Sequence, residues 1–242
     1  MKLKSLMLRA FEGIGYTLTP NWRKQNLALA TLTRELIYAH GVDCVIDVGA
    51  NEGQYRKFMR YEVEFGGTIV SFEPQPELVG VLRTASALDN KWEIRNFALG
   101  AEETELTLNV MERNTFSSFL EPDNSTTPQF NVPNRVKSQH KVPVYRLDAQ
   151  PLPADCERLF LKCDTQGFDM EVIKGASAIL ERVVAIQIEI GVTRIYRGLR
   201  PYYKVLAELD SLGFQPAGFF QVSKNENLST IEFDCVLVNM RY

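Results

Sequence analysis

The segment from Cys44 to Tyr55 places the strongest constraint on the fold of this chain. It begins with the short apolar run Cys-Val-Ile-Asp-Val, of the kind that is buried on both faces of a parallel sheet. The small residues Gly49, Ala50 and Gly53 follow. Small residues between a strand and a helix let the backbone turn sharply and approach a ligand closely. The segment therefore predicts a strand–turn–helix unit with a ligand site at the turn, the alternative being an ordinary glycine turn.

The alternation of strand and helix patterns continues along most of the chain. Strands are expected at 44–48, 68–72, 92–98, 159–163, 183–190, 214–222 and 231–240, and helices at 53–64, 76–88, 169–180 and 201–212. The connector between the last two strands is too short for a crossover, so that pair is antiparallel. The sequence thus predicts an α/β fold: a mostly parallel seven-stranded sheet, a C-terminal antiparallel hairpin and helices on both faces.

The region between residues 101 and 144 departs from this alternation. We expect a strand at 104–110 and a short extended piece at 116–120. Residues 121–139 contain three prolines and many Asn, Ser and Thr residues. They predict a long irregular loop, which in a compact domain is typically a functional lid or partly disordered.

Composition excludes several classes of protein. The 242 residues carry a net charge of −3, whereas a protein that binds duplex nucleic acid normally has a basic excess, so no nucleic-acid partner is expected. No apolar run approaches the roughly 18 residues that span a bilayer, so no transmembrane helix is expected. The four cysteines form no CxxC pair. They are predicted to be buried, reduced thiols in a cytoplasmic protein.

Residues 1–41 are expected to form a helical extension, and residues 42–242 the main domain. The segment 21–40 reads as a helix, and Gly41 after it suits a helix C-cap. Residues 1–15 place three basic side chains among apolar residues spaced three and four apart, the pattern of an amphipathic helix. Such a helix packs on its own domain, on a second subunit in a homodimer, or on an anionic membrane surface.

Acidic residues near the turn narrow the class of ligand. Glu73 follows the second strand, at the distance from Gly53 at which an acidic residue binds ribose hydroxyls in dinucleotide-binding folds. Asp47 and Glu52 flank the turn and would repel a pyrophosphate. They suit a cationic ligand with an amino group and a sulfonium, which describes S-adenosylmethionine (SAM). SAM is therefore the expected cofactor.

Four motifs stand in a fixed order along the chain. They are DVGANEGQY (47–55), FEPQP (72–76), NFALG (96–100) and LKCDTQGFD (161–169) followed by EVIKGA (171–176). Together they resemble the motifs of the FkbM-type methyltransferases, a family with the class I SAM-dependent fold, and the resemblance covers residues 42–240. One departure is Thr165-Gln166, where many members have Val-Glu, so no acid role is carried over to position 166.

The resemblance implies roles in binding SAM for several of the matched residues. The glycine turn would hold the methionine half of SAM, Glu73 would bind the ribose, and Phe97 and Ala98 would border the adenine. The reaction implied is O-methylation of a hydroxyl on a sugar or glycan, or on a polyketide-type metabolite. The candidate cofactor-binding residues are Asp47, Gly49, Ala50, Asn51, Glu52, Gly53, Tyr55, Glu73, Pro74, Phe97 and Ala98.

Three residues are candidates for the chemical step. Asp164 follows the strand at 159–163 and Glu189 ends the next apolar strand, so both should face a cleft at the carboxyl ends of the strands. Asp164 would take the proton of the acceptor hydroxyl, or with Glu189 would hold a Mg²⁺ ion that lowers the pKa of that hydroxyl. The alternatives are a capping role for Asp164 at the helix near Asp169 and a salt bridge for Glu189. His140 is the third candidate, as a general base, or else a solvated surface histidine.

Two rival functions remain open at this point. An NAD(P)-dependent oxidoreductase uses a similar sheet, although the third glycine of its phosphate-binding motif is missing here. A non-catalytic SAM-binding or scaffold module that works through the N-terminal helix is the second rival.

Overall fold

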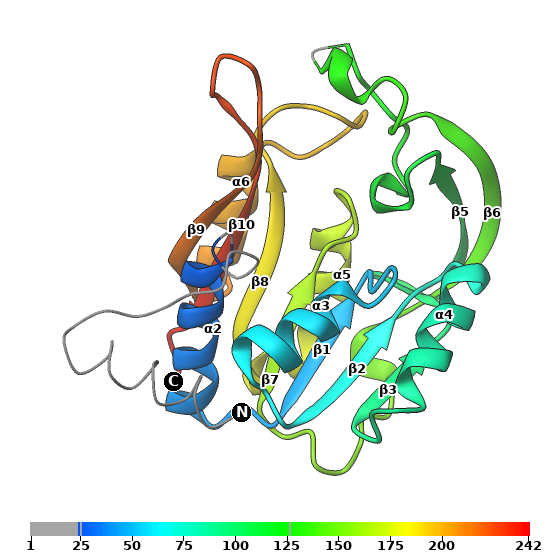
Figure 1. Ribbon diagram of the computed structural model, residues 1–242. Helices are drawn as coiled ribbons and strands as arrows, with labels where there is room; N and C mark the ends of the chain where they lie inside the picture. Colours follow the sequence, from blue (N-terminus) through cyan, green and yellow to red (C-terminus); the bar gives the residue numbers. More distant parts are fainter. Residues whose placement is uncertain (1–23, 25, 126) are drawn as a thin grey trace, which may run out of the picture.

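The computed structural model describes residue 24 and residues 26–125 and 127–242. Its centre is a seven-stranded sheet with the order β3-β2-β1-β7-β8-β10-β9 (Figure 1). All neighbours are parallel except the pairs that β10 makes with β8 and β9, so the predicted α/β sheet and its closing hairpin are confirmed. The strands are β1 (Cys44–Val48), β2 (Thr68–Phe72), β3 (Trp92–Arg95), β7 (Leu159–Cys163), β8 (Val183–Gly191), β9 (Phe214–Lys224) and β10 (Thr230–Asn239).

Helices cover both faces of this sheet. Because strand side chains alternate between the two faces, Val45 packs with one set of helices and Ile46 with the other. The first set is α2 (Leu27–His40), α3 (Gln54–Phe58), its π-helical continuation η2 (Met59–Val63) and α4 (Pro76–Ser86). The second set is α5 (Asp169–Gly175) and α6 (Tyr202–Ser211).

Local sequence explains where these helices begin and end. Gly41 adopts the left-handed conformation after α2, with φ of 62°, and its N–H donates to the carbonyl of Ile37, as expected for a C-cap glycine. Pro76 occupies the first turn of α4, where its missing N–H costs no helical hydrogen bond. The helix expected at 169–180 is instead α5 followed by the 3₁₀ turn η6 (Ser177–Arg182).

The region from 98 to 149 forms a second, three-stranded sheet with the order β4-β6-β5, at the right of Figure 1. The prediction of an irregular loop through residue 139 is wrong in its last part, because β6 begins at Val136 and pairs with β5 along its length. The expected strand at 92–98 is also divided, because Ala98 and Leu99 leave β3 to pair with β6. The elements are β4 (Ala98–Leu99), β5 (Thr104–Met111), η3 (Asn114–Phe116), η4 (Pro128–Phe130), β6 (Val136–Tyr145) and η5 (Leu147–Ala149).

The expected helix at residues 1–15 lies outside the described residues. The domain boundary at residue 41 stays a prediction; α2, just before it, packs into the core cluster of the first sheet face through Leu29, Ala30 and Ile37. Within the described part of the chain, no helix has both the length and the apolar character needed to cross a membrane.

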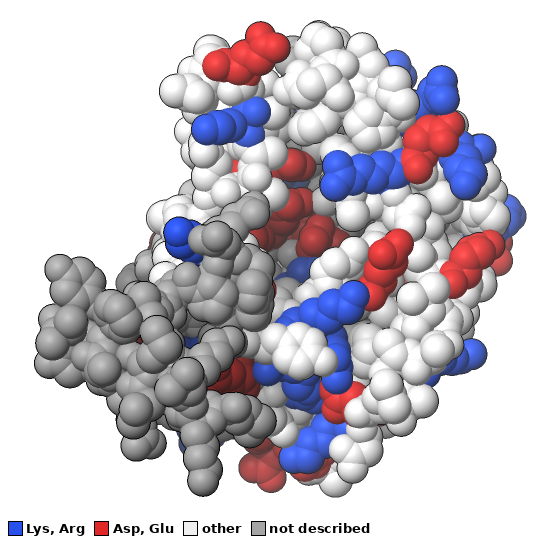
Figure 2. Space-filling model, in the orientation of Figure 1, with Lys and Arg blue, Asp and Glu red and all other residues white. Residues whose placement is uncertain are grey.

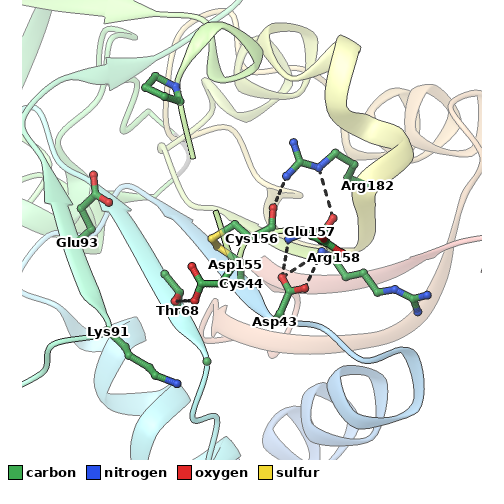
Figure 3. The surroundings of a disulfide bond; sticks show 12 residues. Asp43, Cys44, Thr68, Lys91, Glu93, Asp155, Cys156, Glu157, Arg158 and Arg182 are labelled. Carbon is green, nitrogen blue, oxygen red and sulfur yellow. Dashed lines mark hydrogen bonds between the residues drawn. A yellow bond between two sulfur atoms is a disulfide. The ribbon is translucent and has the colours of Figure 1, made fainter. Parts of the chain in front are cut away.

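Two of the four cysteines form a disulfide, which corrects the prediction of four reduced thiols. Cys44 and Cys156 are bonded, with their Cα atoms 4.9 Å apart (Figure 3). Cys163 and Cys235 are free and buried. The pairing arises because the Asp43 carboxylate accepts backbone N–H groups of Glu157 and Arg158, which brings residue 156 beside the start of β1. The partners are 112 residues apart, so no local spacing pattern marks them.

We expect this disulfide to contribute substantially to stability, because it closes a long loop in the unfolded chain. Reduction, or a Cys44→Ala/Cys156→Ala double variant, should lower the free energy of unfolding by about 2–5 kcal/mol in urea titrations followed by circular dichroism. As a control, a Cys235→Ala variant should remain sensitive to reductant, whereas the double variant should not respond to it. Equal urea midpoints with and without reductant for the wild-type protein would contradict this expectation.

Candidate functional site

A cleft of about 370 Å³ opens at the carboxyl ends of the central strands, within the size range of small-molecule sites. Residues in the carboxyl-terminal parts of β1, β2, β7 and β8 or just after them, together with Asp234 from the middle of β10, line its sheet side. Asn26 and Leu29, Val222 of β9, and the segment 114–119 supply other walls. Figure 2 looks onto this hollow, in which acidic side chains gather.

The sheet register arranges the polar side chains of the cleft in two rows. In the lower row Ser71, Asp47, Lys162 and Gln187 lie side by side on β2, β1, β7 and β8. Two residues further along each strand come Glu73, Gly49, Asp164 and Glu189, and Glu189 is paired with Asp234 of β10. Because side chains two residues apart share a face, the cleft has a carboxylate edge above a polar floor.

Gly49 occupies the one position of the upper row that has no side chain. Its φ is 82°, and a Cβ atom there would lie 2.0 Å from the carbonyl oxygen of Asp164. The N–H groups of Gly49 and Ala50 donate to the carbonyl of Phe72 at 3.0 and 3.1 Å, which fixes the turn against β2. The glycine therefore lets the backbone of the turn pack against that of Asp164, and the turn lines the cleft here without a side chain.

Glu73 lies beside this turn with only 3% of its surface exposed. Its carboxylate accepts the backbone N–H of Asn51 at 2.8 Å and that of Gln75 at 2.9 Å. Burial raises its pKa to about 7. A carboxylate has about four acceptor sites, so two remain for other donors, and Glu73 lines the cleft. Two adjacent ribose hydroxyls fit this donor–acceptor arrangement.

Lys162 connects the floor of the cleft to its edge. The Nζ atom lies 3.4 Å from Oδ1 of Asp47 and 3.3 Å from Oδ2 of Asp164. Burial alone would lower the pKa of Lys162, but the charges of Asp164 and Asp47 outweigh it and raise that pKa. Asp47 is fully buried, which raises its pKa despite Lys162 and the hydrogen bond from Ser71. Asp47 thus helps to hold Lys162 in place and does not itself line the cleft.

Gln166 bridges the two carboxylates proposed for chemistry. Its Nε2 group donates to Asp164 at 3.0 Å and to Glu189 at 2.6 Å, and its Oε1 atom accepts from the hydroxyl of the buried Tyr196 at 2.8 Å. A glutamate at this position could not donate to either carboxylate at neutral pH. The amide therefore lets Asp164 and Glu189 approach each other, although burial and the charge of Asp164 still raise the pKa of Glu189 well above its usual value.

Asp164 does not cap the following helix, so that alternative is wrong. The carboxylate of Asp169 takes the backbone N–H and the hydroxyl of Thr165 and the N–H of Gly167, and so closes the turn before α5. The side chain of Asp164 is 37% exposed and faces the cleft. It is therefore available to a bound molecule.

The structure brings together most of the candidates from the sequence. Those that line the cleft are Gly49, Ala50, Asn51, Tyr55, Glu73, Pro74, Ala98, Asp164 and Glu189. Glu52 is exposed outside the cleft, and Gly53 packs against Trp92, where a Cβ atom would lie 2.8 Å from the ring. Phe97 is packed between Phe72 and Tyr145, with ring centroids 5.4 and 4.9 Å away, and does not line the cleft.

His140 is not brought to the site. It lies exposed on β6 of the second sheet, where its ring nitrogen is 3.0 Å from the hydroxyl of Ser138. It is not among the residues that line the cleft. The prediction that His140 acts as a general base there is therefore wrong, because its side chain is exposed on β6 outside the cleft, as expected for the alternative of a solvated surface histidine.

Among the cleft residues that were missed in the sequence are three polar side chains of the main sheet: Lys162, Gln187 and Asp234. Each interrupts a run of apolar residues within its strand, which was the available signal. Their alignment depends on how β7, β8 and β10 pair, and that register is set by contacts distant in sequence. Gln187 also accepts the hydroxyl of Tyr55 at 2.9 Å, which ties α3 to the polar floor.

A metal site finds no support in the described residues, among which no group of three or more His, Cys, Asp or Glu side chains is arranged to hold a metal ion. Asp164 is instead paired with Lys162 and Gln166, and Glu189 accepts from Gln166. The Mg²⁺ ion expected as an alternative is therefore not supported.

Solved structures resemble this chain in fold. The crystal structure of WbdD is 15% identical, covers 90% of this chain and 40% of its own, and has a TM-score of 0.50. A SAM-dependent methyltransferase from Aquifex aeolicus is 12% identical, covers 91% and 94%, and has a TM-score of 0.44. Magnesium protoporphyrin IX methyltransferase from Synechocystis PCC 6803, solved with bound SAM, is 11% identical, covers 98% and 96%, and has a TM-score of 0.46. No curated protein matches the sequence.

The family itself is identified by sequence. The model of the methyltransferase FkbM domain matches residues 47–216, which is more than half of the chain and includes the glycine turn, Glu73, Asp164 and Glu189. The sheet order and the helices on both faces are those of the class I methyltransferase fold. The chain therefore belongs to the FkbM family of SAM-dependent methyltransferases.

Proposed function

We propose that this protein transfers the methyl group of SAM to a hydroxyl of a sugar, a glycan or a polyketide-type metabolite. The observation that carries the proposal is the order of side chains along the cleft. Glu73 and Asp164 lie on opposite sides of Gly49, so one carboxylate is placed to bind a ribose and the other to meet an acceptor. The family match supports methyl transfer over hydride transfer and over a purely structural module.

The cofactor half of the cleft comprises the turn at Gly49 and the part of the cleft on the Glu73 side of it. Gly49, Ala50 and Asn51 would receive the methionine half of SAM against open backbone, and Glu73 would accept the ribose hydroxyls. Ala98 and Leu99 of β4 line the apolar part of the cleft that suits an adenine. When bound, SAM supplies a methyl group on a cationic sulfur. The sulfur becomes neutral as the methyl group is transferred, so no acid is needed to protonate the leaving group.

The acceptor half contains the groups that would manage the proton. An alcohol has a high pKa and must lose its proton during or soon after attack, so a base near the reacting oxygen accelerates the transfer. Asp164 is exposed to the cleft, and Lys162 and Gln166 fix the orientation of its carboxylate. Asp164 would accept the hydroxyl proton, whereas Glu189 and Gln166 would orient the acceptor.

The predicted cytoplasmic location, homodimer and membrane contact are kept as proposals, and one observation counts against the first of them. A buried disulfide is rare in cytoplasmic proteins, so the Cys44–Cys156 bond counts against the predicted cytoplasmic location. A homodimer, and contact of residues 1–15 with a membrane surface, stay predictions.

Binding of the unmodified cofactor provides the first test. Calorimetry should show SAM binding at micromolar concentrations and no binding of NADH under the same conditions, because Glu73 and Asp164, the carboxylates of the cleft on either side of Gly49, disfavour a pyrophosphate. Binding of NADH in preference to SAM would overturn the proposal.

Glu73 should contribute most of the ribose affinity. Glu73→Gln removes the charge but retains a carbonyl acceptor, so SAM should bind about 10–150-fold more weakly, corresponding to roughly 1.5–3 kcal/mol for charge-assisted hydrogen bonds. Glu77→Gln, at an exposed position on α4, is the matched control and should leave affinity unchanged. Equal affinities of Glu73→Gln and wild type would contradict the ribose assignment.

Asp164 should act on turnover and not on cofactor affinity. Asp164→Asn retains size and hydrogen bonding, so SAM binding should stay within a few-fold while transfer of labelled methyl to a sugar or metabolite extract falls by about 100-fold or more. Asp210→Asn, exposed on α6, is the control. EDTA should leave the wild-type rate unchanged if Asp164 works as a base. Normal turnover by Asp164→Asn would show that Asp164 is not the base for the acceptor hydroxyl.

A further inference from the structure

The acceptor half of the cleft carries an excess of negative charge. The described residues that line the whole cleft include four carboxylates, Glu73, Asp164, Glu189 and Asp234, and a single cationic side chain, Lys162. Three of the four carboxylates lie on the acceptor side of Gly49: Asp164 just after β7, Glu189 near the end of β8, and Asp234 opposite it on β10. Figure 2 shows acidic side chains gathered in the hollow.

The one cation is already committed to other partners. Lys162 lies within 3.4 Å of both Asp47 and Asp164, and Asp47 has no exposure to solvent. Its charge is therefore shared between a carboxylate below the cleft and one at its edge. Gln166 is neutral and donates one amide group to Asp164 and Glu189. The charge of Lys162 also lowers the pKa of Asp234, but among the described residues that line the cleft neither Glu189 nor Asp234 forms an ion pair with a cationic side chain.

Glu189 and Asp234 also oppose each other directly. They are a cross-strand pair of the antiparallel strands β8 and β10, so their side chains emerge on the same face of the sheet. Like charges in this arrangement destabilise a sheet. Burial, with the charge of Asp164 as the next cause, raises the pKa of Asp234 to about 7 and that of Glu189 well above its usual value. A bound positive charge would relieve this repulsion.

The rest of the acceptor half is compatible with such a ligand. Gln187 supplies a polar side chain beneath the pair, and Leu29 and Val222 supply apolar surface beside it. The methionine half of SAM is assigned to the Gly49 side, so its ammonium group does not neutralise Glu189 and Asp234. Among the described residues that line the cleft, none supplies a separate cation for this pair. An acceptor that carries a positive charge would supply one, in place of the protons that the raised pKa values favour.

We infer that the acceptor carries a protonated amine near the hydroxyl that is methylated, and that Glu189 and Asp234 bind this ammonium group. The inference rests on the proposed function, and it narrows the acceptor to amino sugars and related amino alcohols. An ammonium held by two carboxylates has no lone pair and cannot attack SAM, so the hydroxyl remains the nucleophile. Anionic acceptors such as uronic acids and sugar phosphates are disfavoured by the same carboxylates.

Three small cyclohexanols, whose substituent at the fourth carbon is cationic, neutral or anionic, test this inference. They are trans-4-aminocyclohexanol, cyclohexane-1,4-diol and 4-hydroxycyclohexanecarboxylate, titrated into the protein saturated with S-adenosylhomocysteine and followed by ligand-detected NMR. The amino alcohol should bind at least about 10-fold more tightly than the diol, as expected for charge-assisted hydrogen bonds, and the carboxylate should bind most weakly. Equal binding of the three, preference for the carboxylate, or no binding of the amino alcohol would overturn the inference.

Charge-neutral variants identify the residues responsible. Glu189→Gln and Asp234→Asn should each reduce the preference for the amino alcohol, and the double variant should abolish it. Glu103→Gln, exposed beside β5, is the control and should retain the preference. A preference that survives in the folded double variant, with folding verified by circular dichroism, would exclude the two carboxylates as the ammonium site.

The binding of S-adenosylhomocysteine distinguishes a failure of the proposed function from a failure of the ammonium-site inference. The saturation step is measured by calorimetry before any probe is added. If the wild-type protein does not bind S-adenosylhomocysteine, the proposed function fails and the inference falls with it. If it binds S-adenosylhomocysteine but shows no preference for the amino alcohol, the inference alone fails.

Discussion

The buried ammonium of Lys162 is the interaction on which the polar side of the sheet depends. Asp47 is excluded from solvent, and a buried carboxylate without a cationic partner is strongly destabilising. Lys162 supplies that partner from the neighbouring strand and extends its charge to Asp164 at the edge of the cleft. The pair also explains why two ionisable residues occupy strands that are otherwise built from apolar side chains.

Gly49 divides the cleft into two halves, one beside Glu73 and the other beside Asp164. It lies between Glu73 and Asp164 in the upper row, and the close approach of the Asp164 carbonyl leaves no room for a side chain. Carboxylates on either side are thereby separated by bare backbone, across which one ligand can reach both. The same strand order that makes the sheet mostly parallel brings these three residues, far apart in sequence, to one edge.

The sequence was sufficient for the main sheet and for many of the residues around the turn after β1 that line the cleft. The strands β1, β2 and β7 are compact apolar runs, and the turn after β1 is marked by its glycines, so local pattern identifies them. Local sequence pattern does not identify a strand or a site that depends on which strands pair and in what register. β6 is largely exposed and polar, and is a strand because β5 lies beside it. Lys162, Gln187 and Asp234 become a site only through register, and Cys156 finds Cys44 through tertiary structure.

The Cys44–Cys156 bond has a topological consequence. It ties the first strand of the sheet to the segment just before β7, and so encloses β1 to β6, including the whole second sheet, in one covalent ring. A peptide bond cut anywhere inside that ring, for example in the exposed stretch around Val132, would leave the two pieces joined as one molecule. Such a nicked protein would keep its mass apart from one added water, and its fragments would separate only under reducing conditions.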